Sequence, residues 1–190
     1  MHYIIVPGWN GSDADHWQSI WAADWLPQAT RIEPASWTDP DRGDWIRAID
    51  RSLDAIDDEA VFVAHSLGCY AVKHWLAAAR DRSRVRGAFL VAPPDQRAEA
   101  YPADRLATFQ DPQPTALNIP ALLVASENDP YCSFDVAGRI AEGWQIPLIT
   151  AGEQGHINSE SKLGDWPVGR SLLTGFVNSI TPDREADGVR

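Results

Sequence analysis

The segment 61–80 constrains the fold of this chain more than any other stretch. A short apolar, β-prone run leads into a turn with Ser66 at its tip, and residues 70–80 follow with the composition of a helix. This succession is the layout of a nucleophile elbow, in which a strained serine stands between a strand and a helix. Ala64 and Gly68 are small enough to let both elements approach closely, although glycine is more usual at position 64. The alternative is a serine that only caps a helix after a buried strand.

The overall composition excludes several classes of function. With 190 residues, 44% hydrophobic and 23% charged, the chain has the composition of a soluble globular protein. The net charge of −11, from 27 acidic and 16 basic side chains, repels phosphate backbones, so we expect no nucleic-acid partner. No apolar run approaches the roughly 20 residues that span a bilayer, so we expect no membrane segment.

The first residues and the cysteines point to a reducing compartment. The amino-terminal segment shows no basic leader and no cleavage site, and it is typical of a core strand. Two cysteines make no disulfide framework, so we predict a cytoplasmic protein. Cys69 is expected to be a small core residue, whereas Cys132 could be exposed but has no adjacent base. Since the chain has no metal-ligand spacing and no phosphate or dinucleotide motif, we predict neither metal nor cofactor.

Apolar segments of two kinds alternate along the chain and predict a parallel α/β fold. Strands are expected over 3–6, 31–33, 61–64, 87–92, 120–125 and 146–150, and helices over 16–26, 44–56, 70–80, 133–144 and 168–180. The main strands are continuous apolar runs, which is typical of a sheet buried on both faces. We therefore predict a three-layer α/β/α sandwich with about six mostly parallel strands.

The remaining segments set the domain limits. A single domain is expected over 1–180, followed by a disordered polar tail over 181–190. Residues 95–118 are rich in proline and have no clear period, which predicts an irregular excursion with at most one helical turn. Asp13 or Asp15 is expected to cap the first helix.

Polar clusters follow the ends of the predicted strands, where open α/β sheets bind ligands. They comprise the turn 8–11, Ser66, Asp129 and the segment 152–158. A serine hydroxyl is a poor nucleophile at neutral pH and needs a histidine base with an acid to orient it. The chain offers these groups in the order serine, aspartate, histidine, which is typical of α/β-hydrolases.

Asp129 is the preferred acid because it follows the fifth strand, from which it can reach a histidine in the next loop. An aspartate before proline is also a common turn residue, which is the alternative interpretation. Glu127 is the nearest rival as the acid, with Asp135 and Asp165 behind it.

His156 is the preferred base because its loop follows the last strand and contains glycines at 152 and 155 that let it fold back. An exposed loop histidine without a function is the alternative. The other histidines are less suitable: His2 precedes the first strand, His16 and His74 lie in helices, and His65 adjoins the nucleophile.

An oxyanion hole needs two backbone N–H groups. Leu67 is expected to supply one, because the residue after the nucleophile begins a helix whose first N–H groups are unpaired. The glycine turn after the first strand should supply the other, from Trp9 or, as the weaker alternative, Asn10.

Several short segments resemble the RBBP9/YdeN family of small serine hydrolases, within the α/β-hydrolase superfamily. They are Pro7-Gly8-Trp9, His16-Trp17-Gln18 with Trp21, Ala64-His65-Ser66-Leu67-Gly68-Cys69, Ala92-Pro93-Pro94-Asp95, Asp129-Pro130-Tyr131, Gly155-His156-Ile157-Asn158 and Trp166-Pro167. The resemblance covers nearly the whole chain, and the His-Trp-Gln and Gly-His-Ile-Asn segments are more specific than the elbow. In the turn 159–164 relatives tend to have more glycine, so the rim of the pocket differs.

The resemblance implies a compact α/β-hydrolase fold with a minimal lid and a triad of Ser66, Asp129 and His156. It also implies hydrolysis of small esters or amides, and alanine at position 64 is usual in this family.

We therefore hypothesise a serine hydrolase that cleaves a small ester or amide through an acyl-enzyme intermediate. Candidate pocket residues are Asn10, His65, Trp17, Tyr131 and Ile157. The expected partner is a small-molecule substrate, and the sequence makes no prediction of oligomeric state. The alternatives are a weak or inactive hydrolase fold that acts as a binding partner and an acyltransferase that uses the same triad.

Overall fold

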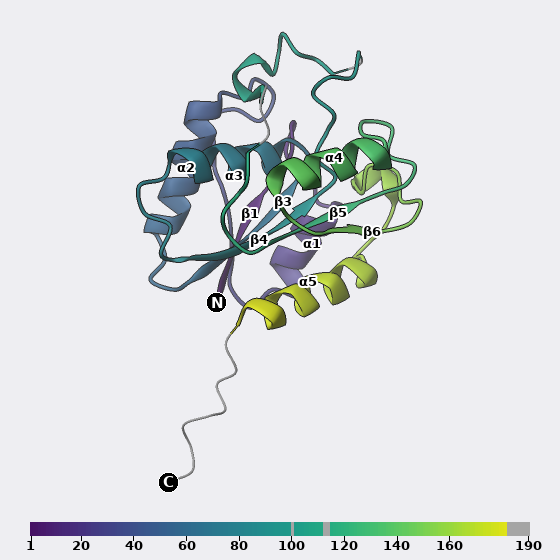
Figure 1. Ribbon diagram of the computed structural model, residues 1–190. Helices are drawn as coiled ribbons and strands as arrows, with labels where there is room; N and C mark the ends of the chain where they lie inside the picture. The colour runs from purple at the N-terminus through teal and green to yellow at the C-terminus, as the bar shows by residue number, and fades with distance from the viewer. Residues whose placement is uncertain (100, 112–114, 182–190) are drawn as a thin grey trace.

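Parallel strands form the centre of the computed structural model, which describes residues 1–99, 101–111 and 115–181 (Figure 1). The strands are β1 (His2–Val6), β2 (Ala29–Arg31), β3 (Ala60–His65), β4 (Val85–Val91), β5 (Ala121–Ala125) and β6 (Leu148–Thr150). They form one sheet in the order β2-β1-β3-β4-β5-β6, and every neighbouring pair is parallel.

Helices cover both faces of this sheet. They are α1 (Trp17–Asp24), α2 (Arg42–Asp54), α3 (Leu67–Ala78), α4 (Phe134–Trp144) and α5 (Pro167–Ile180). Figure 1 shows α2, α3 and α4 on one face and α1 and α5 on the other. Two separate apolar cores lie between the layers, one on each face. The predicted three-layer α/β/α architecture is confirmed.

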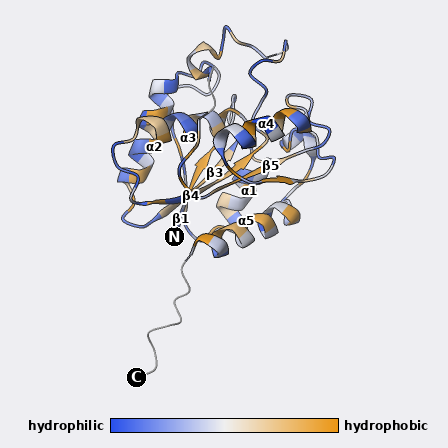
Figure 2. Cartoon of the chain, in the orientation of Figure 1, coloured by the Kyte–Doolittle hydropathy of each residue, from blue (hydrophilic) through white to orange (hydrophobic). Residues whose placement is uncertain are grey.

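The burial of each element explains its sequence pattern. All six residues of β3 are buried, because helices cover the strand on both faces, so its sequence is a continuous apolar run. Hydrophilic and hydrophobic segments alternate along the outer helices in Figure 2, which is the pattern of helices with one polar and one apolar face. Side chains cap the starts of α2 and α4: the Asp41 carboxylate accepts from the Asp44 N–H, and the Ser133 hydroxyl accepts from the Val136 N–H.

The strand order reverses direction between β1 and β3. From β1 the chain adds β2 on one side, then crosses to add β3 and the later strands on the other. The loops after β1 and β3 therefore leave the sheet side by side at its carboxyl edge, where open α/β sheets bind ligands. The turn at Gly8 and the elbow serine meet at this position.

The first helix and the second strand differ from their predicted limits. His16, rather than Asp13 or Asp15, caps α1: its ring Nδ1 accepts from the Gln18 N–H at 3.2 Å. The second strand ends at Arg31 because only one further bond, from the Ile32 N–H to the Ile5 carbonyl, continues the pairing. Beyond Thr181, the predicted tail lies outside the described residues.

The predicted excursion over 95–118 contains one short 3₁₀ helix, Ala107–Phe109, within its described part. Phe109 is fully buried and anchors the excursion in the apolar core. An ion pair between Lys73 of α3 and Asp111 ties it down further. None of the helices in the described part of the chain is long and apolar enough to cross a membrane.

The close approach of α3 to β1 leads to a test of stability. A Cβ atom on Gly68 would lie 2.2 Å from the Val6 carbonyl oxygen and 2.6 Å from that of Pro7, so Gly68→Ala must push backbone apart. We expect a loss of about 3 kcal/mol in the free energy of unfolding, measured by urea denaturation. Gly138 in α4 has nothing within 4 Å of the same position, so Gly138→Ala should add about 0.5–1 kcal/mol. Equal stabilities of the two variants would contradict this account of the elbow.

Candidate active site

Ser66 stands at the tip of a sharp turn between β3 and α3. Its φ of 53° and ψ of −124° are strained for a residue with a side chain. Its N–H donates to the Val91 carbonyl at 2.9 Å, which continues the pairing of β3 with β4 up to the serine itself. The helix begins at Leu67, directly after the turn. The hydroxyl is thereby presented at the carboxyl edge of the sheet.

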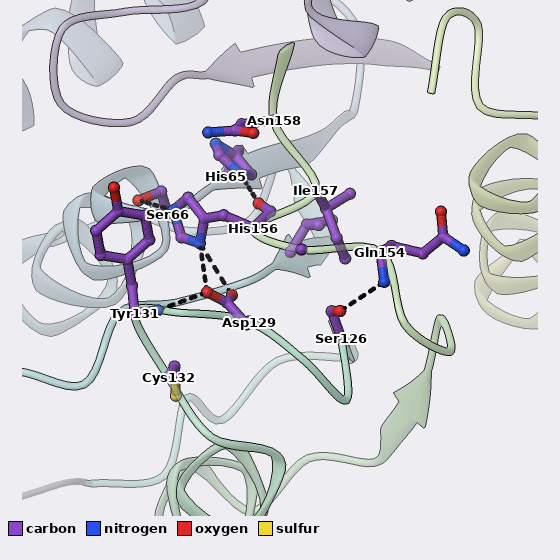
Figure 3. A network of polar contacts seen from close by, with 12 residues as sticks. His65, Ser66, Ser126, Asp129, Tyr131, Cys132, Gln154, His156, Ile157 and Asn158 are labelled. Atoms are coloured by element: carbon purple, nitrogen blue, oxygen red, sulfur yellow. Dashed lines mark hydrogen bonds and ion pairs between the residues drawn. The ribbon is translucent and has the colours of Figure 1, made fainter. Parts of the chain in front are cut away.

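A chain of hydrogen bonds joins Ser66 to two residues distant in sequence (Figure 3). The Nε2 atom of His156 lies 2.9 Å from the Ser66 Oγ atom. Its Nδ1 atom lies 2.9 and 3.0 Å from the two carboxylate oxygens of Asp129. An ionised carboxylate only accepts hydrogen bonds, so Nδ1 carries the imidazole proton and Nε2 is left to accept from the serine hydroxyl. This is the arrangement that a histidine base requires.

Asp129 is held in place by its own turn. Its Oδ1 atom accepts from the Tyr131 N–H at 2.8 Å, and the residue is only 8% exposed. The rival acids have other neighbours. Glu127 accepts from the Thr150 hydroxyl and Asp165 pairs with Arg170, while Asp135 lies in the first turn of α4. Of the four candidate acids, Asp129 is the one that the structure places against His156.

The other histidines have separate partners. His2 bonds to the Thr30 hydroxyl at 2.8 Å, and His74 donates to the Phe109 carbonyl at 3.1 Å. His65 donates from Nε2 to the backbone carbonyl of His156 at 2.9 Å, so its ring supports the loop of the base and does not reach the serine.

Two neutral histidines lie beside the base. Burial, and then the neighbouring His16 and His156, hold the pKa of His65 well below its ordinary value. Burial likewise lowers the pKa of His16 to about 4. The rings of His16 and His65 meet edge to face with centroids 4.8 Å apart. Both rings are therefore uncharged at neutral pH, and neither adds a positive charge next to His156.

The glycine turn after β1 packs directly against the nucleophile. A Cβ atom on Gly8 would lie 2.8 Å from the Ser66 Cβ atom, so only glycine lets the turn come this close. The Asn10 N–H donates to the Trp37 carbonyl at 2.9 Å and is already used. The geometry therefore favours Trp9 over Asn10 as the second oxyanion donor, beside Leu67 at the start of α3.

A cavity of about 390 Å³ opens above Ser66 and His156. Asn10, His65 and Tyr131 line it, as the sequence predicted for pocket residues. Tyr131 is half exposed, and its ring centroid lies 4.7 Å from that of His156.

Trp17 and Ile157 were also predicted to line the pocket, and the structure corrects both. Trp17 is 1% exposed and Ile157 is fully buried, because they belong to the core between the sheet and the helices α1 and α5. The Trp17 Nε1–H donates to the Ile157 carbonyl at 2.8 Å. The side chains of these two residues therefore belong to the core and not to the lining of the cavity.

The excursion after β4 supplies much of the cavity wall, which the sequence did not predict in detail. It contributes Asp95, Ala98, Tyr101, Pro102 and Leu106, and Pro94, directly before it, also lines the cavity. Asp13 and Glu160 also line the cavity. The segment is too irregular to place from periodicity, and its length, which is typical of functional loops, was the signal that it could matter.

Charge is distributed unevenly around this cavity. Three carboxylates, those of Asp13, Asp95 and Glu160, line it, and none of its described lining residues is lysine or arginine. Two cations lie next to lining residues: the Arg105 guanidinium stacks on Trp9 and donates to the Thr38 carbonyl, and the Arg31 guanidinium lies beside Gly11 and donates to the Ser12 carbonyl. The charged side chains that line the cavity itself are therefore all acidic.

Clusters of possible metal ligands and the two cysteines are the remaining reactive features of the described residues. Within residues 1–99, 101–111 and 115–181, no three histidine, cysteine or acidic side chains cluster as metal ligands would. Cys69 is buried as predicted, whereas Cys132 is only 4% exposed and packs with Ala125 and Ala137. The possibility that Cys132 is exposed was thus wrong, because the turn after β5 folds under α4.

The strand order, the elbow and the positions of the three loops together define the class of the protein as an α/β-hydrolase. The chain belongs to the serine hydrolase family, whose model matches residues 3–175. It is therefore an enzyme of hydrolase type, and the resemblance to the RBBP9/YdeN family is confirmed. Among curated proteins, none matches the chain.

Solved structures show the same relationship. A YdeN-like hydrolase from Pectobacterium atrosepticum is 33% identical, with a TM-score of 0.81 over 95% of this chain and 92% of that one. The ydeN gene product of B. subtilis is 19% identical, with a TM-score of 0.69 over 93% and 98% of the two chains. Est1E from Butyrivibrio proteoclasticus, solved with ferulic acid, is 13% identical, with a TM-score of 0.69 over 94% and 88%. The last two similarities show the fold alone.

Burial of the two cysteines leads to a prediction of thiol reactivity. Burial raises the pKa of Cys132 to about 12 and that of Cys69 higher still, so neither forms a reactive thiolate at neutral pH. We expect the native protein to react with less than one equivalent of a thiol reagent such as dithionitrobenzoate, and the protein unfolded in guanidinium to react with two. Rapid labelling of Cys132 in the native state would contradict its placement.

Proposed function

We propose that this serine hydrolase cleaves small carboxylic esters or amides through a triad of Ser66, His156 and Asp129. The observation that carries the proposal is the hydrogen-bond chain from Ser66 Oγ through the His156 ring to Asp129, with each distance near 2.9 Å. The serine sits at the base of the cavity, where a bound carbonyl carbon can reach its hydroxyl.

In the proposed first step the Ser66 oxygen attacks the substrate carbonyl carbon while its proton passes to His156 Nε2. Asp129 holds the ring in the required tautomer and stabilises the imidazolium that forms. The negative charge on the carbonyl oxygen is stabilised by the N–H groups of Leu67 and Trp9. Collapse of the tetrahedral intermediate expels the alcohol or amine, which takes the proton from Nε2, and leaves an acyl-enzyme.

In the second step a water molecule attacks the acyl-enzyme. His156 accepts a proton from this water and then returns it to the Ser66 oxygen, which releases the carboxylic acid. An acyltransferase would use an added alcohol in place of water at this point. An excess of acyl transfer over hydrolysis in the presence of added alcohol would favour that alternative.

The size and lining of the cavity support a small substrate. A volume of about 390 Å³ accommodates a short acyl chain with a modest leaving group, at the lower end of the range for ligand sites. The described part of the excursion contains one short 3₁₀ helix, which is too little structure to form a lid over a long lipid chain.

Loss of the nucleophile or the base provides the direct test. We expect wild-type protein to be labelled by a fluorophosphonate probe and to turn over short p-nitrophenyl esters. Ser66→Ala and His156→Ala should abolish labelling and lower kcat by about 10⁴-fold or more, because each removes the covalent route. His74→Ala, which alters a histidine outside the site, is the control and should keep both activities. Labelling that survives in Ser66→Ala would overturn the assignment.

The acidic lining predicts selection against anionic substrates. We expect kcat/KM for mono-p-nitrophenyl adipate to be about tenfold below that for the similarly sized p-nitrophenyl hexanoate, because its carboxylate faces like charges. The difference should shrink at high salt and in Glu160→Gln. Glu153→Gln removes an exposed carboxylate outside the cavity and serves as the matched control. Equal kcat/KM values for the two esters at low salt would contradict the effect of the lining.

A further inference from the structure

The loop that carries His156 has a backbone conformation that must be stabilised by contacts with other segments. It follows the short edge strand β6 and includes left-handed backbone at Gly152, Gly155 and Ile157, with φ values of 74°, 57° and 50°. Glycine adopts this conformation freely, but for a β-branched residue such as Ile157 it is strained. The strain persists only where contacts from other parts of the structure impose it.

The first half of the loop is tied to the turn of Asp129. The Gly155 N–H donates to the Asn128 side-chain oxygen at 2.7 Å, and the Gln154 N–H donates to the Ser126 hydroxyl at 2.8 Å. These bonds set the distance between the two loops that bear the base and the acid. They do not set the distance from the base to Ser66.

The second half of the loop is held by two buried side-chain donors that act on consecutive carbonyls. The His65 Nε2–H donates to the His156 carbonyl at 2.9 Å (Figure 3), and the Trp17 Nε1–H donates to the Ile157 carbonyl at 2.8 Å. His65 is 4% exposed and Trp17 is 1% exposed, so water does not replace either donor. Since a carbonyl only accepts, His65 must carry its proton on Nε2.

Both donors are themselves fixed to β3 or β1, the two strands whose carboxyl ends lie next to Ser66. His65 directly precedes Ser66 on β3. Trp17 is carried by α1, whose Gln18 side chain donates to the carbonyls of Val6 and Val63 at 3.3 and 3.0 Å. The His16 ring caps the same helix and packs edge-on against His65.

We propose that His65 and Trp17 form a clamp that positions His156 against Ser66, with His16 and Gln18 aligning the clamp. The proposal rests on the triad mechanism above, and it assigns His65 and Trp17 as positioning residues that act through His156. It also gives the His16-Trp17-Gln18 segment a role: its side chains connect β3, β1 and the loop that carries His156. Loss of either donor should let the ring move away from the serine hydroxyl.

The test compares variants that remove a donor with matched variants that do not. His65→Leu and Trp17→Phe each remove one N–H, and we expect kcat to fall by about 10²-fold with KM within about twofold, because a 1 Å displacement of a catalytic group costs this much. His65→Gln places an amide N–H near the original Nε2 position and should recover most of the lost kcat. Trp21→Phe is the matched control, because Trp21 belongs to the same indole cluster but its Nε1–H donates to the Asp165 carbonyl and not to a carbonyl of the His156 loop. Trp21→Phe should keep kcat within about threefold even where its thermal stability falls as far as that of Trp17→Phe.

Two outcomes of the kinetic comparison would overturn the clamp. The first is retention of near wild-type kcat in both His65→Leu and Trp17→Phe. The second is an equal fall of kcat in Trp21→Phe and Trp17→Phe, which would reduce the effect to general core packing.

A measurement on the unmutated protein tests the clamp independently of turnover. Nitrogen-15 NMR of the imidazole rings should show His65 as the neutral Nε2–H tautomer, with that proton protected from exchange. The Nδ1–H tautomer would overturn the proposal even if every variant failed to fold. Failure of the triad mechanism has a different signature, since Ser66→Ala would then keep its esterase activity while the His65 tautomer stayed unchanged.

Discussion

The contact between the start of α3 and the end of β1 is the constraint on which the rest of the site depends. Gly68 brings the helix against the carbonyls of Val6 and Pro7, where any side chain would collide with backbone. This contact forces the tight turn before the helix and holds Ser66 at a positive φ. It also brings the Gly8 turn within contact of the serine, so the nucleophile and the proposed oxyanion donors are positioned by one packing interaction.

The parallel sheet converts this local arrangement into a site. Because all its strands point the same way, the loops after β3, β5 and β6 leave the sheet at a single edge. Ser66, Asp129 and His156 come from these three loops and meet there within hydrogen-bond distance. The edge strand β6 is the weakest support of the three, which explains why the loop of His156 draws so many bonds from neighbouring segments.

Local patterns predicted the fold well but placed the pocket poorly. Continuous apolar runs mark β3, β4 and β5 because both sheet faces are covered, and helical periodicity marks α2 equally well. Trp17 and Ile157 were misjudged because an aromatic or apolar residue beside a functional motif has the same sequence signal whether it faces the cavity or the core. The side chains of the cavity wall after β4 could not be placed for a related reason, since an irregular segment anchored by Phe109 has no periodic sequence pattern.

The sequence by itself determined the class of fold, the three side chains of the proposed triad and their order along the chain, because strand burial, turn chemistry and loop position leave local traces. Only the tertiary structure decided that Asp129 rather than Glu127 faces His156, that the Asn10 N–H is already used, and that Trp17 supports the loop of the base from behind. Each of these depends on contacts between segments far apart in sequence. The physical reason is that a side chain's partner is set by how packed layers bring such segments together, and no local pattern of residues encodes that arrangement.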